Sequence, residues 1–224
     1  MFSSITGWYD RLNSILSLGQ DGIWRSKLIG GAALPDHGLV LDICTGSGDL
    51  ALGFLTQRKD FRGRVYAIDI SAPMIDTARS KLARLGAPYP RRVEFLMGDA
   101  LDMQFPDNKF DVVSCGFGVR NMNDLEQGLT EIHRVLKRGG EADILEFFPD
   151  GITSGFVRWY TDRVVPWLGN LLSGTGAYSY LQHSRGQFLS REEFEDLLTW
   201  VGFREIRWER MIFGIAHIVR ARKG

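Results

Sequence analysis

The hydrophobic positions of this chain fall into five short runs that are separated by amphipathic stretches. The runs cover residues 39–44, 64–69, 93–97, 110–115 and 142–147, and each is too short for a helix of ordinary length. Strands that are buried on both faces of a parallel sheet read as continuous apolar runs. The pattern therefore predicts five buried strands of one sheet.

Helices are expected between these strands, near residues 49–58, 73–85 and 123–137. The Gly139-Gly140 pair is expected to end the third of them, because glycine commonly follows the last turn of a helix. The alternation of strand and helix predicts a parallel sheet with helices on both faces, which is an α/β fold.

The alternation stops after the fifth run. Residues 153–182 are rich in aromatic side chains and are predicted to form helices, and residues 190–201 form a helix whose N-cap is Ser190. Residues 203–221 read as a final pair of strands, which would add an antiparallel end to the sheet. Residues 1–30 are predicted to be a helical N-terminal arm with one apolar face.

Composition and charge exclude several classes of protein. The chain has 224 residues, of which 44% are apolar and 24% charged, as in an ordinary soluble domain. Its 27 Lys and Arg balance its 27 Asp and Glu without a local basic patch, so nucleic acid is not an expected partner. No apolar run reaches the roughly 18 residues of a spanning helix, and the N-terminus lacks the apolar centre of a signal peptide. We expect a cytoplasmic protein.

The chain has two cysteines, Cys44 and Cys115, and each lies at the end of an apolar run. Neither belongs to a pair with the spacing of metal ligands, so no metal site is expected. The prediction is that both are reduced, buried thiols.

A turn of small residues follows the first strand and leads directly into a helix. Gly46 and Gly48, with Ser47 between them, allow backbone conformations and a close ligand approach that a Cβ would forbid. The start of the following helix offers free N–H groups to a ligand. The same segment also matches the dinucleotide pattern, so NAD and a purely structural turn remain alternatives at this point.

Carboxylates follow the second and third strands. Asp69, ahead of Ile70, stands where an acid can accept both hydroxyls of a ribose, although a helix-capping or solvated carboxylate is the alternative. Asp99, ahead of Ala100, is placed to bind an adenine amino group at the same sheet edge. Because dinucleotide enzymes do not particularly require the second loop, these segments together favour S-adenosylmethionine over NAD. The expected cofactor-binding residues are Gly46, Ser47, Gly48, Asp69, Ile70, Asp99, Ala100 and Gly116.

The segment from Gly116 to Asn121 follows the fourth strand and reads Gly-Phe-Gly-Val-Arg-Asn. Two glycines beside an Arg-Asn pair are unusual for a simple turn, and the carboxyl end of a strand is where open α/β sheets bind ligands. We expect this segment to face the substrate. A surface salt bridge is the alternative for Arg120.

At these residues the chain resembles the ubiquinone/menaquinone biosynthesis C-methyltransferases, above all the demethylmenaquinone methyltransferases. The resemblance runs nearly end to end. Its motifs include Tyr9-Asp10-x-x-Asn13, Gly46-Ser47-Gly48-Asp49, Gly98-Asp99-Ala100, Phe117-Gly118-Val119-Arg120-Asn121 and Ala177-Tyr178-x-Tyr180-Leu181. The chain departs from the family at Cys44-Thr45, where the family usually has Ala-Gly, at Gly116, where it often has Ser, and at His183-Ser184-Arg185, where it has Glu-Ser-Ile.

The resemblance implies a class I S-adenosylmethionine-dependent methyltransferase fold. This is an α/β, Rossmann-like fold with a mostly parallel seven-stranded sheet that ends in an antiparallel strand, plus a helical N-terminal arm and a helical insertion. Residues 1–224 would form a single domain. Its parts would be the arm or lid at 1–30, the cofactor-binding half at 39–148, the substrate-binding insertion at 153–189 and the C-terminal helix and strands at 190–224.

The resemblance also implies methyl transfer from S-adenosylmethionine to a ring carbon of a prenylated demethylnaphthoquinol. Arg120 would stabilise the phenolate that makes the ring carbon nucleophilic, and Asn121 would orient the ring oxygens. Tyr9 would close over the cofactor with the arm. His183 is the alternative proton acceptor, although a lone histidine is more often structural.

Phe117, Tyr178 and Tyr180 are the expected substrate-binding residues, and the aromatic segment around the tyrosines is a candidate groove for the prenyl tail. Core packing or a homodimer contact is the alternative for that segment. A lipid substrate implies transient contact with the membrane surface, at the inner face. The rival functions are a methyltransferase for a benzoquinol or another small lipid, a binding protein without turnover and a NAD-dependent oxidoreductase.

Overall fold

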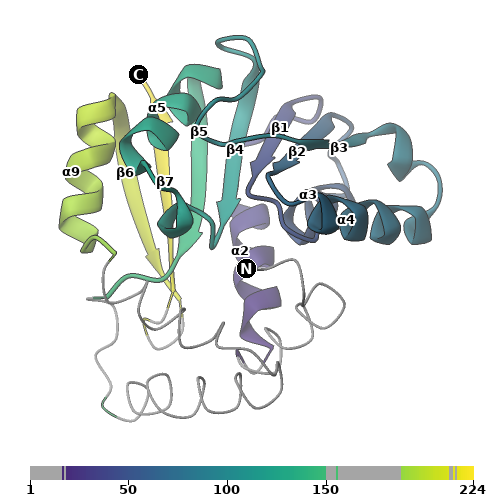
Figure 1. The fold of residues 1–224 in the computed structure, drawn as a ribbon, viewed down its shortest axis with the longest axis horizontal. Helices are drawn as coiled ribbons and strands as arrows, with labels where there is room; N and C mark the ends of the chain where they lie inside the picture. The colour runs from purple at the N-terminus through teal and green to yellow at the C-terminus, as the bar shows by residue number, and fades with distance from the viewer. Residues whose placement is uncertain (1–16, 18, 150–154, 156–187, 212–213, 215) are drawn as a thin grey trace.

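A computed structural model describes residues 17, 19–149, 155, 188–211, 214 and 216–224. These residues form a seven-stranded sheet with helices on both faces, as the sequence predicts (Figure 1). The strands are β1 (Leu39–Ile43), β2 (Arg64–Asp69), β3 (Val93–Met97), β4 (Phe110–Gly116), β5 (Leu136–Glu146), β6 (Phe203–Arg210) and β7 (His217–Lys223). The helices are α2 (Gln20–Gly31), α3 (Asp49–Gln57), α4 (Ala72–Leu85), α5 (Leu125–Val135) and α9 (Arg191–Val201), with short 3₁₀ turns η1 (Tyr89–Arg91) and η2 (Val119–Asn121).

The strand order across the sheet is β3-β2-β1-β4-β5-β7-β6, which runs from right to left in Figure 1. Strands β1 to β5 pair in parallel, and β7 runs antiparallel to both β5 and β6. The expected antiparallel addition is therefore confirmed, with β7 inserted between two strands of the opposite direction. The chain proceeds from β1 outward to β3 and then returns to the other side of β1. This reversal places a ligand crevice at the carboxyl ends of β1 and β4.

Two hydrophobic clusters cover the two faces of the sheet. One packs α2, α3 and α4 against apolar residues of the strands, among them Val40 and Val65. The other packs α5 and α9 against the opposite face, where Leu41 and Val113 lie. Consecutive strand residues such as Val40 and Leu41 thus serve different clusters, because successive side chains of a strand point to opposite faces. This burial on both faces explains the continuous apolar runs.

The boundary between α5 and β5 corrects the sequence prediction. Helix α5 ends at Val135 and not at the Gly139-Gly140 pair, and β5 begins at Leu136, where it pairs with Phe110. The register shifts after this pair, and Gly139 takes a φ of 74° within the irregular stretch. The glycines therefore accommodate a bulge in the strand instead of ending a helix.

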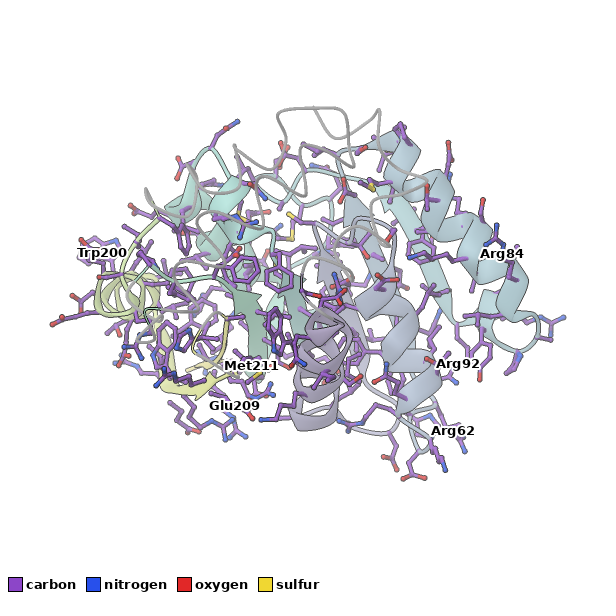
Figure 2. All side chains as sticks on the ribbon, turned by 90° about the horizontal axis from the view of Figure 1, so that it is seen from below. Arg62, Arg84, Arg92, Trp200, Glu209 and Met211 are labelled. Atoms are coloured by element: carbon purple, nitrogen blue, oxygen red, sulfur yellow. The ribbon has the colours of Figure 1, made fainter. Side chains whose placement is uncertain are left out.

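The ends of the domain are described in part. Helix α2 lies in the expected N-terminal arm, and α9 begins with the predicted cap, in which Ser190 and Glu193 bond each other's backbone N–H groups. Trp200 projects outward from α9 and is 78% exposed (Figure 2). The predicted helices over 153–182 lie outside the described residues, apart from residue 155. Among the helices that are described, none is long and apolar enough to cross a membrane.

Candidate active site

The glycine turn between β1 and α3 lies at the predicted crevice. Gly46 and Gly48 have φ angles of 55° and 84°, which favour glycine. A Cβ at Gly48 would come within 2.9 Å of both Ala78 and the Phe95 ring, whereas a Cβ at Gly46 would meet nothing within 4 Å. Gly48 is therefore needed for packing beneath the turn, and Gly46 leaves open space above it in which a ligand can approach the backbone.

A lysine of α4 stabilises the glycine turn through hydrogen bonds. Lys81 of α4 donates hydrogen bonds to Ser47 Oγ (2.9 Å) and to Asp49 Oδ1 (2.5 Å) at the start of α3. Ser47 is buried, and its side chain supports the turn through this bond. Sequence reasoning did not identify Lys81, because nothing in its local pattern indicates a partner more than thirty residues away.

A buried acid joins the turn to the two central strands. Asp42 of β1 is fully buried and accepts hydrogen bonds from Thr45 Oγ1 (2.6 Å) and from Ser114 Oγ (2.7 Å) of β4. Burial raises the pKa of Asp42 to about 6, and the two hydroxyl hydrogen bonds limit the rise. The residue was not among the predicted site residues, although it belongs to the segment that carried the resemblance.

Asp69 connects the end of β2 to the glycine turn. Its Oδ2 accepts the N–H of Gly46 at 2.8 Å, and its Oδ1 accepts the N–H of Ser71 at 2.9 Å. An ionised carboxylate offers about four acceptor positions, so these bonds leave capacity for the two hydroxyls of a ribose. The structure thus places Asp69 beside the turn. The alternative of a helix-capping carboxylate accounts for its bond to Ser71 but not for its bond to Gly46.

The ends of β2 and β3 expose an apolar surface at the same sheet edge. Ile70 is 72% exposed, and Met97, whose strand position pairs with Asp69, is 53% exposed. In the loop after β3, Asp99 is exposed and its Oδ1 accepts the N–H of Leu101 at 2.9 Å, whereas Ala100 is buried. This edge therefore combines apolar side chains with an accessible carboxylate. The apolar side chains suit the ring face of a nucleobase, and the carboxylate suits its amino group.

The segment after β4 approaches the turn closely. A Cβ at Gly116 would lie 2.8 Å from a methyl group at the end of the Leu50 side chain of α3, so a larger residue here would require that side chain to shift. Phe117 takes a φ of 60° and donates its N–H to the Leu145 carbonyl at 2.8 Å. Asn121 is exposed and donates its side-chain amide to the Phe117 carbonyl at 3.2 Å.

Arg120 forms a buried ion pair, which corrects the surface alternative. Its Nη1 lies 2.6 Å from Glu146 Oε1 at the end of β5, and the two side chains are only 5% and 0% exposed. Burial raises the pKa of Glu146, and the charge of Arg120 opposes that rise. Among the described residues, the Arg120 Nε is buried without a hydrogen-bond partner. Because a buried donor is rarely left unsatisfied, this atom is a candidate donor to a group that the described residues do not supply.

Three aromatic rings lie beside this pair. The centroid of Phe147 is 4.6 Å from that of Phe117, and Trp24 of α2 is 6.2 Å from both. The guanidinium of Arg120 lies over Phe147 at 5.1 Å. Helix α2 of the N-terminal arm therefore reaches the segment after β4 through Trp24, and the rings provide apolar area next to the charged groups.

The described residues bring together most of the predicted site. Gly46, Ser47, Gly48 and Asp69 share one hydrogen-bonded turn, while the segments that carry Ile70, Asp99, Gly116 and Arg120 follow strands β2 to β4 at one sheet edge. Four predicted residues, Tyr9, Tyr178, Tyr180 and His183, lie outside the described residues. In the part of the chain that the structure describes, no group of three or more acidic, histidine or cysteine side chains could hold a metal ion.

Two solved structures with the same fold are named as methyltransferases. A possible histamine N-methyltransferase from Thermotoga maritima matches with a TM-score of 0.68 at 19% identity and covers 100% of this chain and 98% of its own. An S-adenosylmethionine-dependent methyltransferase from Aquifex aeolicus matches with a TM-score of 0.63 at 23% identity, covering 88% of both chains. At these identities the likeness shows the fold, which is the predicted class I methyltransferase fold.

Sequence relatives are closer. The chain is 40% identical to the ubiquinone/menaquinone biosynthesis C-methyltransferase UbiE of Geobacter sulfurreducens, over 100% of this chain and 87% of the relative. It is also 40% identical to a demethylmenaquinone methyltransferase of Thermus thermophilus, over 97% of each chain. The model of the ubiE/COQ5 methyltransferase family matches residues 1–223. The site geometry, the fold and these matches agree, and the chain belongs to the ubiE/COQ5 methyltransferase family.

Proposed function

We propose that this chain transfers the methyl group of S-adenosylmethionine to a ring carbon of a prenylated demethylnaphthoquinol, the reduced form of demethylmenaquinone. Its membership of the ubiE/COQ5 family and the activities for which its relatives are named support methyl transfer in quinone biosynthesis. The single observation that carries the assignment of the reacting site is the buried Arg120–Glu146 pair, which lies beside a cluster of aromatic rings and whose Nε donor has no partner among the described residues.

The crevice fits an adenosine cofactor. The open side of the turn at Gly46 would admit the amino-acid part of the cofactor to the backbone. Asp69 has acceptor capacity for the ribose hydroxyls, and the exposed Ile70 offers apolar area to the adenine face. Asp99 would accept from the adenine amino group. Bound there, S-adenosylmethionine supplies an electrophilic methyl group on a positively charged sulfur.

The chain must make the acceptor carbon nucleophilic. A ring carbon of the hydroquinol becomes a sufficiently strong nucleophile when the neighbouring phenol loses its proton. The site therefore has to stabilise a phenolate. Arg120 would donate from its Nε to that oxygen, and Asn121 would orient the ring. Because Glu146 already compensates the guanidinium charge, the pair acts through a fixed hydrogen-bond donor more than through a free positive charge. After the carbon–carbon bond forms, the ring carbon loses a proton and the ring becomes aromatic again.

The remaining predicted site residues would form a lid, accept the proton of the substrate or contact the substrate and its prenyl tail. We retain Tyr9 as part of a lid, His183 as the alternative proton acceptor, and Phe117, Tyr178 and Tyr180 as substrate contacts. Among the described residues, the contact of Phe117 with Trp24 and Phe147 supports its role beside the ring of the acceptor. A prenylated substrate would bring the protein to a membrane surface transiently.

The test is transfer of labelled methyl from S-adenosylmethionine to a reduced, prenylated 2-demethylnaphthoquinol, with the matching demethyl-benzoquinol in parallel. We expect activity on the naphthoquinol. Activity on both acceptors would support the alternative of a dual enzyme, as the name of the Geobacter sulfurreducens relative indicates. If the protein binds S-adenosylmethionine and labels neither quinol, the substrate assignment is wrong.

The role of Arg120 is tested with two variants. Arg120→Ala should abolish turnover and spare S-adenosylmethionine binding, because the residue lies on the acceptor side of the site. Arg120→Lys keeps a positive charge beside the buried Glu146 and so controls for misfolding, but it lacks the Nε donor. Turnover at the wild-type rate in a folded Arg120→Lys protein would remove the Nε donor from the mechanism.

A further inference from the structure

The two cysteines of the chain meet beneath the glycine turn. Ile43, the last residue of β1, pairs with Cys115 of β4, and Cys44 directly follows Ile43. A Cβ placed at Gly118 would lie 2.8 Å from Cys115 Sγ and 3.1 Å from Cys44 Sγ. Both sulfur atoms therefore lie close to the same glycine, and a larger residue at position 118 would clash with them.

The two thiols differ in accessibility. Cys115 is fully buried as predicted, whereas Cys44 is partly exposed at the point where β1 leads into the turn, which corrects the prediction that both thiols are buried. A hydrogen bond with Cys44, together with burial, raises the pKa of the Cys115 thiol well above its ordinary value. A reagent from solvent would therefore meet Cys44 first, with Cys115 close behind it, and the raised pKa keeps Cys115 in the thiol form until Cys44 has reacted.

We propose that Cys44 and Cys115 form an oxidation-sensitive dithiol, and that its closure to a disulfide weakens S-adenosylmethionine binding at the adjoining turn. The second half of this inference rests on the proposed function of the turn between Gly46 and Gly48. The oxidant is a peroxide, which takes two electrons from the pair.

The chemistry balances in two steps. The Cys44 thiolate attacks one oxygen of hydrogen peroxide, the O–O bond breaks, and Cys44 sulfenic acid and hydroxide form. Cys115 then loses its proton and attacks the sulfenic sulfur as the thiolate, the S–O bond breaks as the S–S bond forms, and the departing hydroxide takes up that proton and leaves as water. In sum, two thiols and one peroxide give one disulfide and two waters, and dithiothreitol reverses the result by thiol–disulfide exchange.

Closure would act on the turn through Cys44. A disulfide requires its sulfur atoms to lie about 2.05 Å apart with a restricted torsion, so at least one of the two cysteines must move. Cys115 is held within β4, whereas Cys44 follows β1 with a φ of 50°, a conformation that non-glycine residues adopt at a cost. The next residue, Thr45, donates its N–H to Ile68 and its hydroxyl to Asp42. A displaced Cys44 would disturb these two bonds and the glycine turn that follows them.

The experiment treats the full-length protein with hydrogen peroxide and maps the cysteine peptides by mass spectrometry. Calorimetry then measures the Kd for S-adenosylmethionine in the reduced, oxidised and re-reduced protein. We expect one Cys44–Cys115 disulfide, an increase in Kd of about tenfold on oxidation, and recovery with dithiothreitol. Cys44→Ser and Cys115→Ala should each lose the change in Kd on peroxide treatment, relative to the untreated form of the same variant.

Two outcomes would overturn the inference. One is the absence of a disulfide while Cys44 is oxidised to sulfinic acid, which would show that Cys115 does not resolve it. The other is an unchanged Kd in protein that mass spectrometry shows to be fully disulfide-bonded. Failure of the reduced protein to bind S-adenosylmethionine is a different result, because it contradicts the proposed cofactor, while mass spectrometry still decides whether the disulfide forms.

Discussion

The ion pair between Arg120 and Glu146 makes a quantitative prediction about stability. Replacing Arg120 by Met preserves much of the side-chain volume but leaves the Glu146 carboxylate, which is 0% exposed, without its countercharge. Removal of one partner of a buried pair costs about 3–5 kcal/mol, because the remaining charge stays desolvated. For a chain of this length, that corresponds to a fall in Tm of roughly 6–20 °C.

The assay is urea denaturation of the wild type and Arg120→Met at pH 8, followed by fluorescence of the tryptophans. The matched control is Lys27→Met, which removes the cation of an equally short but exposed pair with Glu209, where the side chains are 53% and 41% exposed. This control should cost about 0–1 kcal/mol, because solvent screens an exposed pair. The double variant Arg120→Met/Glu146→Gln should recover part of the loss, since no buried charge remains.

The stability of the Arg120→Met variant should depend on pH in a defined direction. Burial already raises the pKa of Glu146 in the folded protein, and loss of Arg120 would raise it further. The folded variant would then bind a proton more tightly than the unfolded chain, so its stability should fall as pH rises above the unfolded pKa. The cost of Arg120→Met should therefore be smaller at pH 5 than at pH 8. A cost below about 1 kcal/mol at pH 8, or one independent of pH, would refute this account of the pair.

Three further predictions concern the crevice. Gly48→Ala should destabilise the fold by about 1–3 kcal/mol in urea, because its Cβ would press on the Phe95 ring, whereas Gly46→Ala should cost about 1 kcal/mol for its positive φ alone. An equal cost at both positions would contradict the packing argument. Asp42 has a folded pKa of about 6 against 3.8, so its contribution to stability is greatest below about pH 4 and falls by about 3 kcal/mol as pH rises through 6. Asp42→Asn should flatten the dependence of the unfolding free energy on pH between about pH 4 and 7. An unchanged pH dependence would show that a group other than Asp42 causes it. Ile70→Ser should leave the Tm unchanged, because the side chain is 72% exposed, and should raise the calorimetric Kd for S-adenosylmethionine; an unchanged Kd would remove Ile70 from the cofactor site.

The sequence by itself determined where most strands of the sheet lie along the chain. Continuous apolar runs identified strands β1 to β4 to within a residue or so, since burial on both faces favours apolar side chains at most strand positions. The glycine turn and the acids at the strand ends followed from local spacing. These features depend on interactions between neighbouring residues or on burial alone, and both leave a pattern that can be read along the chain.

Only the tertiary structure decided which distant groups meet. The partner of Arg120 is Glu146, the partners of Asp42 include Ser114, and Cys44 lies beside Cys115, all because of the register between adjacent strands. The end of α5 at Val135 was likewise set by the pairing of Leu136 with Phe110, which local glycine preferences could not anticipate. Such contacts depend on strand order and register, which one sequence constrains weakly, and they set the burial that shifts the pKa values of the site.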